Sequence, residues 1–176
     1  MTRSKRLTVG IVDLGISNIT SVSNAFKRIG CECHLLNEDS NDVKVDVLVL
    51  PGVGNFGYLA ARLDSSSLRV RILKHHREKS PIIGICLGMQ ILFETSHEST
   101  SSRGLGLIPG EVKLLSSQAS KECIRSVPNI GYNVVTALDG SSGCFKQELD
   151  ALTGYYYFLH SYAVFDRQLD VDLEGV

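Results

Sequence analysis

The sequence lacks the features that mark several classes of protein. None of its 176 residues falls in an apolar run long enough to cross a membrane, and the first apolar stretch, residues 7–12, is too short for a signal-peptide core and is broken by Asp13. Neither sign of charge is in excess, since the sequence has 18 Lys and Arg and 19 Asp and Glu. Nothing therefore predicts binding to nucleic acid or to a membrane, and a cytoplasmic protein is expected.

The number of cysteines is odd, and their spacing matches no metal-binding pattern. Without a secretory signal, five cysteines indicate reduced thiols rather than a disulfide framework. No C-x-x-C or H-x-x-x-H spacing is present, so no metal is expected, and no phosphate-binding fingerprint indicates a cofactor. Cys31 and Cys33 lie two apart on an expected strand, and we expect them to pack on one face of it.

Alternating strand and helix patterns predict an α/β fold. Strand patterns occupy residues 7–12, 31–36, 45–50 and 82–85, and helix patterns occupy residues 18–29, 57–63, 67–79 and 89–93. This order predicts a single domain, residues 1–176, with a largely parallel sheet covered by helices on both faces. Ligands of such sheets bind at the carboxyl ends of the strands.

The second half of the chain predicts a different arrangement. Residues 96–106 are rich in Ser and Gly and are expected to form a mobile loop. Beyond them, residues 111–115, 132–137 and 155–164 alternate like strands, which predicts an antiparallel extension.

Cys86 stands between two glycines in the segment GICLG, where a strand pattern passes into a helix pattern. A tight turn of this kind strains the backbone and brings neighbouring backbone close, which favours residues without side chains at Gly84 and Gly88. The positive end of the following helix favours the thiolate, which is the reactive form of cysteine. A nucleophile is one reading of this motif, and a small buried cysteine that fills space is the other.

The segment PGVG, residues 51–54, directly follows an apolar strand pattern. Its two glycines can turn backbone N–H groups toward one point beside Cys86. An oxyanion hole needs such donors, although a plain tight turn uses the same residues.

Five segments in fixed order carry a family resemblance: PGVGNF, GICLGMQILFE, GLGLIPGEV, PNIGYN and HSY. Together they closely resemble the class I glutamine amidotransferases, and among them the glutaminase subunits of imidazole glycerol phosphate synthase. The resemblance implies a three-layer α/β sandwich with a mainly parallel, flavodoxin-like sheet and an antiparallel extension. It implies that Cys86 attacks the glutamine amide and forms a thioester, and that the backbone of Gly52, Val53 and Gly54 forms the oxyanion hole. The glutamine would be held by Gln90, Ser161 and Tyr162.

The resemblance also implies a partner. Ammonia freed from glutamine would pass to a synthase subunit with a (β/α)8 barrel, which makes imidazole glycerol phosphate in histidine biosynthesis. Because ammonia released into water is protonated and lost as a nucleophile, a sealed heterodimer is expected. Its interface is expected around Asn18, Asn129, Tyr132 and Asn133.

Some family features are missing from these 176 residues. The family takes its general base and the orienting carboxylate from an H-P-E-K-S motif, and the sequence ends at DLEGV before any such motif. His160 matches a family histidine that is not the base. A polypeptide of these residues is therefore expected to be inactive, either as a fragment incomplete at the C-terminus, which we favour, or as a truncated form.

Other departures keep three further readings open. The segments DLGISN and PNIGYN differ from the family at Leu14, Ser17, Asn129 and Tyr132. A paralogue that feeds a synthase modifying surface-polysaccharide sugars is one alternative, and a non-catalytic binding partner is the second. Another hydrolase with a cysteine at a strand-to-helix turn is the third, although it would not explain Gln90, HSY and PGVG together.

Overall fold

The computed structural model describes residues 6–40, 43–118, 127–135 and 153–165. Contacts divide these residues into two compact units. The first comprises the described residues up to Lys113 together with Val164 and Phe165, and the second comprises those from Leu114 to Ala163. Cys86 and the PGVG loop both belong to the first unit.

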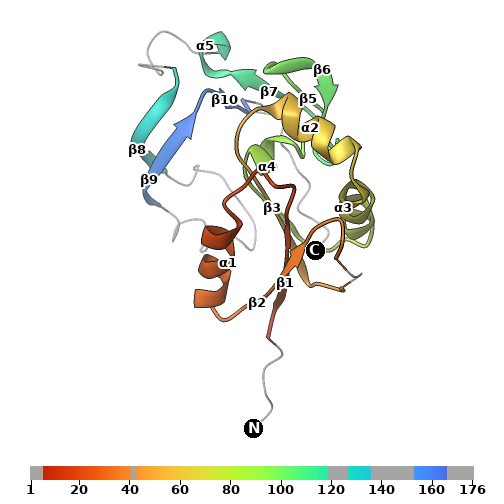
Figure 1. The fold of residues 1–176 in the computed structure, drawn as a ribbon. Helices are drawn as coiled ribbons and strands as arrows, with labels where there is room; N and C mark the ends of the chain where they lie inside the picture. Colours follow the sequence, from red (N-terminus) through yellow and green to blue (C-terminus); the bar gives the residue numbers. More distant parts are fainter. Residues whose placement is uncertain (1–5, 41–42, 119–126, 136–152, 166–176) are drawn as a thin grey trace. The chain divides into compact units, whose positions relative to one another are not determined.

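The first unit is built on a four-stranded parallel sheet with the strand order β2-β1-β3-β4 (Figure 1). Its strands are β1 (Thr8–Val12), β2 (Glu32–Leu36), β3 (Val47–Gly52) and β4 (Ile82–Cys86). The two central strands, β1 and β3, are almost entirely buried. Strands covered on both faces need apolar side chains at successive positions, which explains the continuous apolar runs in the sequence. The predicted parallel sheet is confirmed.

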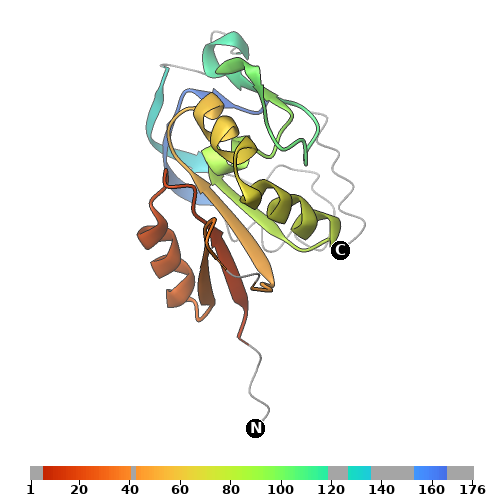
Figure 2. The same ribbon diagram turned by 45° about the vertical axis from the view of Figure 1, so that its right-hand side comes forward.

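Helices cover both faces of this sheet (Figure 2). Helix α1 (Ile19–Arg28) packs on the face that carries Val49, while α2 (Phe56–Asp64) and α3 (Ser67–Arg77) pack on the face that carries Leu48 and Leu50. Side chains alternate between the two faces along β3, so one strand supplies both cores. Within the described ranges, no helix is long and apolar enough to cross a membrane.

Two local predictions were wrong. Most of the loop expected at residues 96–106 is a hairpin, in which β5 (Thr95–Ser96) pairs antiparallel with β6 (Ser99–Arg103), and β5 also pairs in parallel with β7 (Glu111–Leu114). Backbone pairing satisfies the N–H and C=O groups whatever the side chains, so a serine-rich segment can form strands. The helix expected at residues 89–93 is α4 (Leu87–Gln90), which begins directly after Cys86 and lasts one turn.

The second unit contains α5 (Leu115–Gln118), β8 (Asn129–Val135), β9 (Gly154–His160) and β10 (Tyr162–Ala163). β8 and β9 pair antiparallel along their whole length, from Asn129 opposite His160 to Val135 opposite Gly154. The predicted antiparallel pairing is thus confirmed, and its first strand begins three residues before the predicted range.

Candidate active site

Cys86 is the last residue of β4 and immediately precedes α4. Its backbone lies at φ 55° and ψ −117°, a region that residues with a side chain rarely adopt. The side chain is exposed. The strained strand-to-helix turn predicted from GICLG is present, and the alternative of a buried cysteine that fills space is wrong.

Glycines on both sides of Cys86 allow α4 to pack directly on the sheet. A Cβ atom on Gly88 would overlap the carbonyl oxygen of Leu50, and a Cβ atom on Gly84 would overlap the backbone of Met89. Both obstacles are backbone, which cannot move aside as a flexible side chain can. Close packing therefore requires glycine at these two positions.

The PGVG loop begins beside Cys86. Gly52 is the register partner of Cys86 in the β3–β4 pair, and a Cβ atom on Gly52 would lie 2.8 Å from the backbone nitrogen of Gly88. Neighbouring strands lie about 4.8 Å apart, so the loop begins one strand spacing from the cysteine. Gly54 has a φ of +102°, which favours glycine, and Val53 between the two glycines is 55% exposed.

Glu98, at the turn of the β5–β6 hairpin, contacts the other end of the PGVG loop. Its Oε2 accepts a hydrogen bond of 2.7 Å from the backbone nitrogen of Phe56, the first residue of α2. Asn55 caps the same helix, because its Oδ1 accepts from the backbone nitrogen of Tyr58 at 3.2 Å. No local sequence pattern signals this role of Glu98, since the contact joins residues 42 apart.

The residues expected to hold glutamine are divided between the two units. Gln90 is the last residue of α4, one helical turn after Cys86, and is only 7% exposed. Ser161 and Tyr162 lie in the second unit, where the carbonyl of Ser161 accepts a 2.9 Å hydrogen bond from the backbone nitrogen of Leu115. Of the three residues expected to bind glutamine, Gln90 is thus the one that α4 places next to the turn at Cys86.

The residues expected at a partner interface have differing surroundings. Asn18 caps α1 by accepting a 3.2 Å hydrogen bond from the backbone nitrogen of Ser21. In the second unit, the side chain of Asn133 donates to Oδ1 of Asn129 at 3.1 Å. Tyr132 lies on the other face of β8, because side chains alternate along a strand. β8 therefore presents two distinct surfaces, one with the two asparagines and one with the tyrosine.

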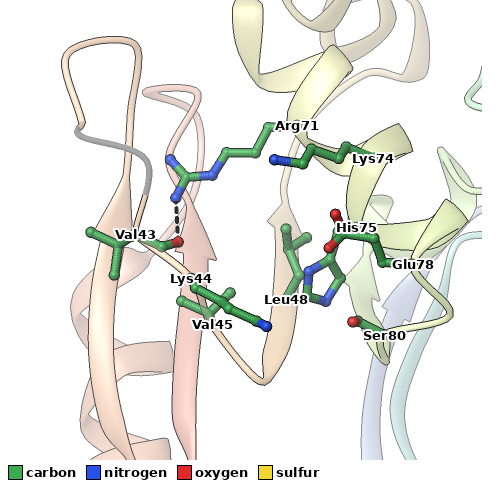
Figure 3. Close-up of a pocket in the computed structure, with 9 residues that line it drawn as sticks. All are labelled: Val43, Lys44, Val45, Leu48, Arg71, Lys74, His75, Glu78 and Ser80. Carbon is green, nitrogen blue, oxygen red and sulfur yellow. Dashed lines mark hydrogen bonds between the residues drawn. The ribbon is translucent and has the colours of Figure 1, made fainter.

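A cavity of about 300 Å³ lies beside α3 (Figure 3). Its lining includes Ser80, which precedes β4, whereas Cys86 ends that strand. His75 lines it and is largely buried, with its Nε2 3.1 Å from the carbonyl oxygen of Pro81. Pro81 precedes β4 and Cys86 ends it, and five residues of extended strand span about 16 Å. His75 is therefore too far from Cys86 to take its proton.

Two further histidines of the first unit have other partners. His34 lies on β2, at the opposite edge of the sheet from β4, with its Nε2 3.3 Å from the carboxylate of Glu32. His97 follows β5, with its Nε2 3.1 Å from the carboxylate of Glu111. Hydrogen bonds from Lys113 and His97 hold the pKa of Glu111 below its ordinary value. Each of these two rings thus has a carboxylate as its neighbour.

His160, in the second unit, uses both ring nitrogens. Its Nδ1 lies 3.1 Å from the carbonyl oxygen of Tyr162, and its Nε2 lies 3.1 Å from the side-chain nitrogen of Asn129. A proton on Nδ1 and a lone pair on Nε2 satisfy both contacts. This arrangement agrees with a structural role for His160 rather than that of a general base.

The α/β fold and the exposed cysteine at a strained turn define a class of enzyme. The family model described as "Glutamine amidotransferase class-I" matches residues 10–171, so the chain belongs to the class I glutamine amidotransferase family. Within that class its relatives include imidazole glycerol phosphate synthase HisH subunits, such as that of Aquifex aeolicus, which is 40% identical over 164 residues covering 88% of this chain and 70% of that protein. The predicted family is confirmed.

Two other comparisons extend this result. The protein named "Imidazole glycerol phosphate synthase hisHF" from Emericella nidulans is 35% identical over 158 residues, which cover 89% of this chain but 28% of that one. A solved structure titled "Crystal structure of glutamine amidotransferase" superposes with a TM-score of 0.66 at 16% identity, over 90% of this chain and 74% of the other. The predicted α/β fold class is confirmed.

Proposed function

We propose that the protein hydrolyses glutamine to glutamate and ammonia with Cys86 as the nucleophile. The sulfur attacks the side-chain amide carbon, and collapse of the tetrahedral intermediate releases ammonia and leaves a glutamyl thioester, which water hydrolyses. A base must take the thiol proton and return it to the leaving ammonia, and none of the five histidines is assigned to this role. The proposed oxyanion donors are Gly52, Val53 and Gly54, and the proposed glutamine ligands are Gln90, Ser161 and Tyr162.

The backbone of Cys86 carries this proposal. A side chain at φ 55° costs about 1–3 kcal/mol and persists only where the surrounding structure enforces it. Here the close packing at Gly84 and Gly88 enforces it, and the side chain stays exposed. Strain of this kind clusters at active sites, where it aims a reactive side chain at the substrate.

Alkylation by a chloromethyl ketone analogue of glutamine tests the nucleophile. The thiolate forms a sulfur–carbon bond and chloride leaves, so peptide mapping locates the reacting residue. We expect label on Cys86, slower labelling in the presence of glutamine, and none at this peptide in Cys86→Ala. Label found mainly on Cys31 or Cys33, or no protection by glutamine, contradicts the proposal.

We also propose that the ammonia passes to a (β/α)8-barrel synthase subunit that makes imidazole glycerol phosphate in histidine biosynthesis. The HisH relatives are named as subunits of imidazole glycerol phosphate synthase. The Emericella nidulans relative matches this chain over only 28% of its length, so the matching segment there is part of a much longer polypeptide. A docked partner would exclude water from the released ammonia and keep it a nucleophile.

The β8–β9 hairpin offers a surface for this partner. Six apolar side chains share one face of the hairpin, because they alternate along each strand and lie opposite one another across it. All are between 54% and 75% exposed. This apolar strand face consists of Ile130, Tyr132, Val134, Tyr155, Tyr157 and Leu159. At its centre the rings of Tyr132 and Tyr157 pack edge to face, with centroids 5.4 Å apart.

Tyr132→Ala tests this surface. Truncating a central aromatic residue of an interface typically costs about 2 kcal/mol, which is about 30-fold in Kd. We expect weaker binding to the synthase in calorimetry and an unchanged melting temperature. Ile29→Ala is the matched control, since Ile29 is 75% exposed at the end of α1, away from the carboxyl ends of the strands. Lower melting with unchanged affinity contradicts the proposed interface.

Two alternatives give different results in these experiments. A paralogue that serves a synthase modifying surface-polysaccharide sugars would show the same Cys86 labelling but bind a different synthase, and the replacement of family residues by Leu14 and Tyr132 favours it. A non-catalytic binding partner would bind a synthase without glutamine-protected labelling of Cys86. His34 lies on the strand at the opposite edge of the sheet, and His75 lies beside the opposite end of β4, which agrees with this second alternative.

A further inference from the structure

The β5–β6 hairpin is docked on the first turn of α2, and the two lie side by side in both views (Figures 1 and 2). A Cβ atom on Gly57, the second residue of α2, would lie 2.5 Å from the Oγ atom of Ser99 and 3.1 Å from that of Ser102. These two hydroxyls also hydrogen-bond to each other at 2.8 Å. The absence of a side chain at Gly57 therefore allows the hairpin to close on the helix.

The turn of the hairpin is anchored from within. The Oγ atom of Ser96 accepts a 3.2 Å hydrogen bond from the backbone nitrogen of Glu98, and Ser96 is 2% exposed. Ser96 lies opposite Val112 in the β5–β7 pair, and Val112 is fully buried. Glu98 thus extends from a backbone that is fixed on the side away from α2.

The Glu98 carboxylate binds an amide that α2 cannot satisfy by itself. The first amides of a helix have no acceptor within it, and the side chain of Asn55 accepts from the amide of Tyr58. Glu98 accepts from Phe56 at 2.7 Å, in a charge-assisted hydrogen bond at the positive end of the helix. The side chain of Phe56 is fully buried, so the first residue of α2 is held through both its backbone and its side chain.

We propose that Glu98 is a positioning residue for the oxyanion loop, an inference that rests on the function proposed above. One end of the loop is fixed because Gly52 pairs with Cys86 in the sheet. The other end is fixed where Glu98 holds Phe56, two residues after Gly54. Glycine-rich backbone is intrinsically mobile, and oxyanion donors act only when held at the position of the developing charge. The hairpin thereby supplies the second of two fixed points.

Cys86 alkylation in the full chain tests the inference. When the thiolate adds to the carbonyl carbon of the chloromethyl ketone, the carbonyl oxygen becomes negative and takes the oxyanion position, after which the sulfur moves to the methylene carbon, chloride leaves and the carbonyl forms again. Iodoacetamide is displaced directly at its methylene carbon with loss of iodide and needs no oxyanion donor. Glu98→Gln should lower the maximal rate with the ketone about 10-fold, less than the 10²–10³-fold typical of losing a donor outright. The half-saturating concentration and the iodoacetamide rate should stay at the wild-type values.

Gly57→Ala provides an independent perturbation. Its methyl group should displace Ser99 and the hairpin without altering the carboxylate, so it should lower the maximal ketone rate in the same way. His97→Gln is the control on the same turn, since this exposed ring contacts Glu111 and should leave both rates unchanged. If Glu98→Gln does not fold, as judged by circular dichroism, Gly57→Ala alone tests the positioning role. A lower maximal ketone rate in Gly57→Ala then supports the role, and a wild-type rate overturns it.

The outcomes separate this inference from the proposed function. Wild-type ketone rates in Glu98→Gln and Gly57→Ala overturn the positioning role while the function stands. A higher half-saturating concentration in Glu98→Gln alone, with Gly57→Ala like wild type, shows direct contact with the reagent and also overturns it. If the wild-type protein is not labelled at Cys86, the proposed function fails, and the inference fails with it.

Discussion

Replacing Cys86 by glycine should stabilise the protein relative to replacing it by alanine. Alanine keeps the Cβ atom and therefore the cost of φ 55° and ψ −117°, which is about 1–3 kcal/mol. Glycine removes that cost but gives the unfolded chain more freedom, which costs about 0.4–1 kcal/mol. The net difference is about 1 kcal/mol in favour of Cys86→Gly. For a chain of 176 residues this corresponds to about 2–4 °C in Tm, measured by scanning calorimetry.

The same pair of substitutions at Cys33 is the control. Cys33 lies within β2, where glycine should be less stable than alanine by about 0.5–1 kcal/mol because no strain is relieved. The sign of the glycine-minus-alanine difference should thus reverse between the two cysteines. A Cys86→Gly protein that melts below Cys86→Ala would refute the strained turn and remove the main support for Cys86 as the nucleophile.

Three further predictions concern the close packing at Gly88, the cap of α1 and the carboxylate of Glu38. Gly88→Ala should lower the free energy of unfolding by about 3 kcal/mol in urea titration, because its methyl group would overlap the backbone of β3. Asn18→Ala should cost about 1 kcal/mol through loss of the α1 cap, and Asn18→Ser, which can still cap, should cost less. Hydrogen bonds from Ser66 and Ser67 hold the pKa of Glu38 below its ordinary value, so its carboxylate stabilises the fold above the pKa of the unfolded state and the contribution is lost as pH falls through the lowered pKa. The Tm difference between wild type and Glu38→Gln should therefore be largest at neutral pH and vanish in acid.

The elements that depend on local spacing could be predicted from the sequence. The apolar runs of β1 and β3 and the helical spacing of α1 predicted a parallel sheet with helices on both faces, because burial on two faces imposes its own pattern on each segment. The predicted helix range 18–29 also agrees closely with α1, since Asn18 caps the helix and Gly30 follows it with a φ of 88°. GICLG predicted the turn at Cys86 because the glycines that the packing requires are adjacent to the cysteine in the chain.

The distant segments that support that turn could be identified only in the folded chain. The strands at residues 95–103 carry no apolar alternation, since their pairing depends on β7 and their docking depends on the bare backbone of Gly57. The hydrogen bond between Glu98 and Phe56 joins positions 42 residues apart, and the residues next to each partner in the sequence form no motif that would indicate it. Likewise the β8–β9 register, not the resemblance, gathers Tyr132 with five other apolar side chains and leaves Asn129 on the opposite face. Local patterns fix periodicity and caps, whereas contacts between segments arise only when the whole chain is folded.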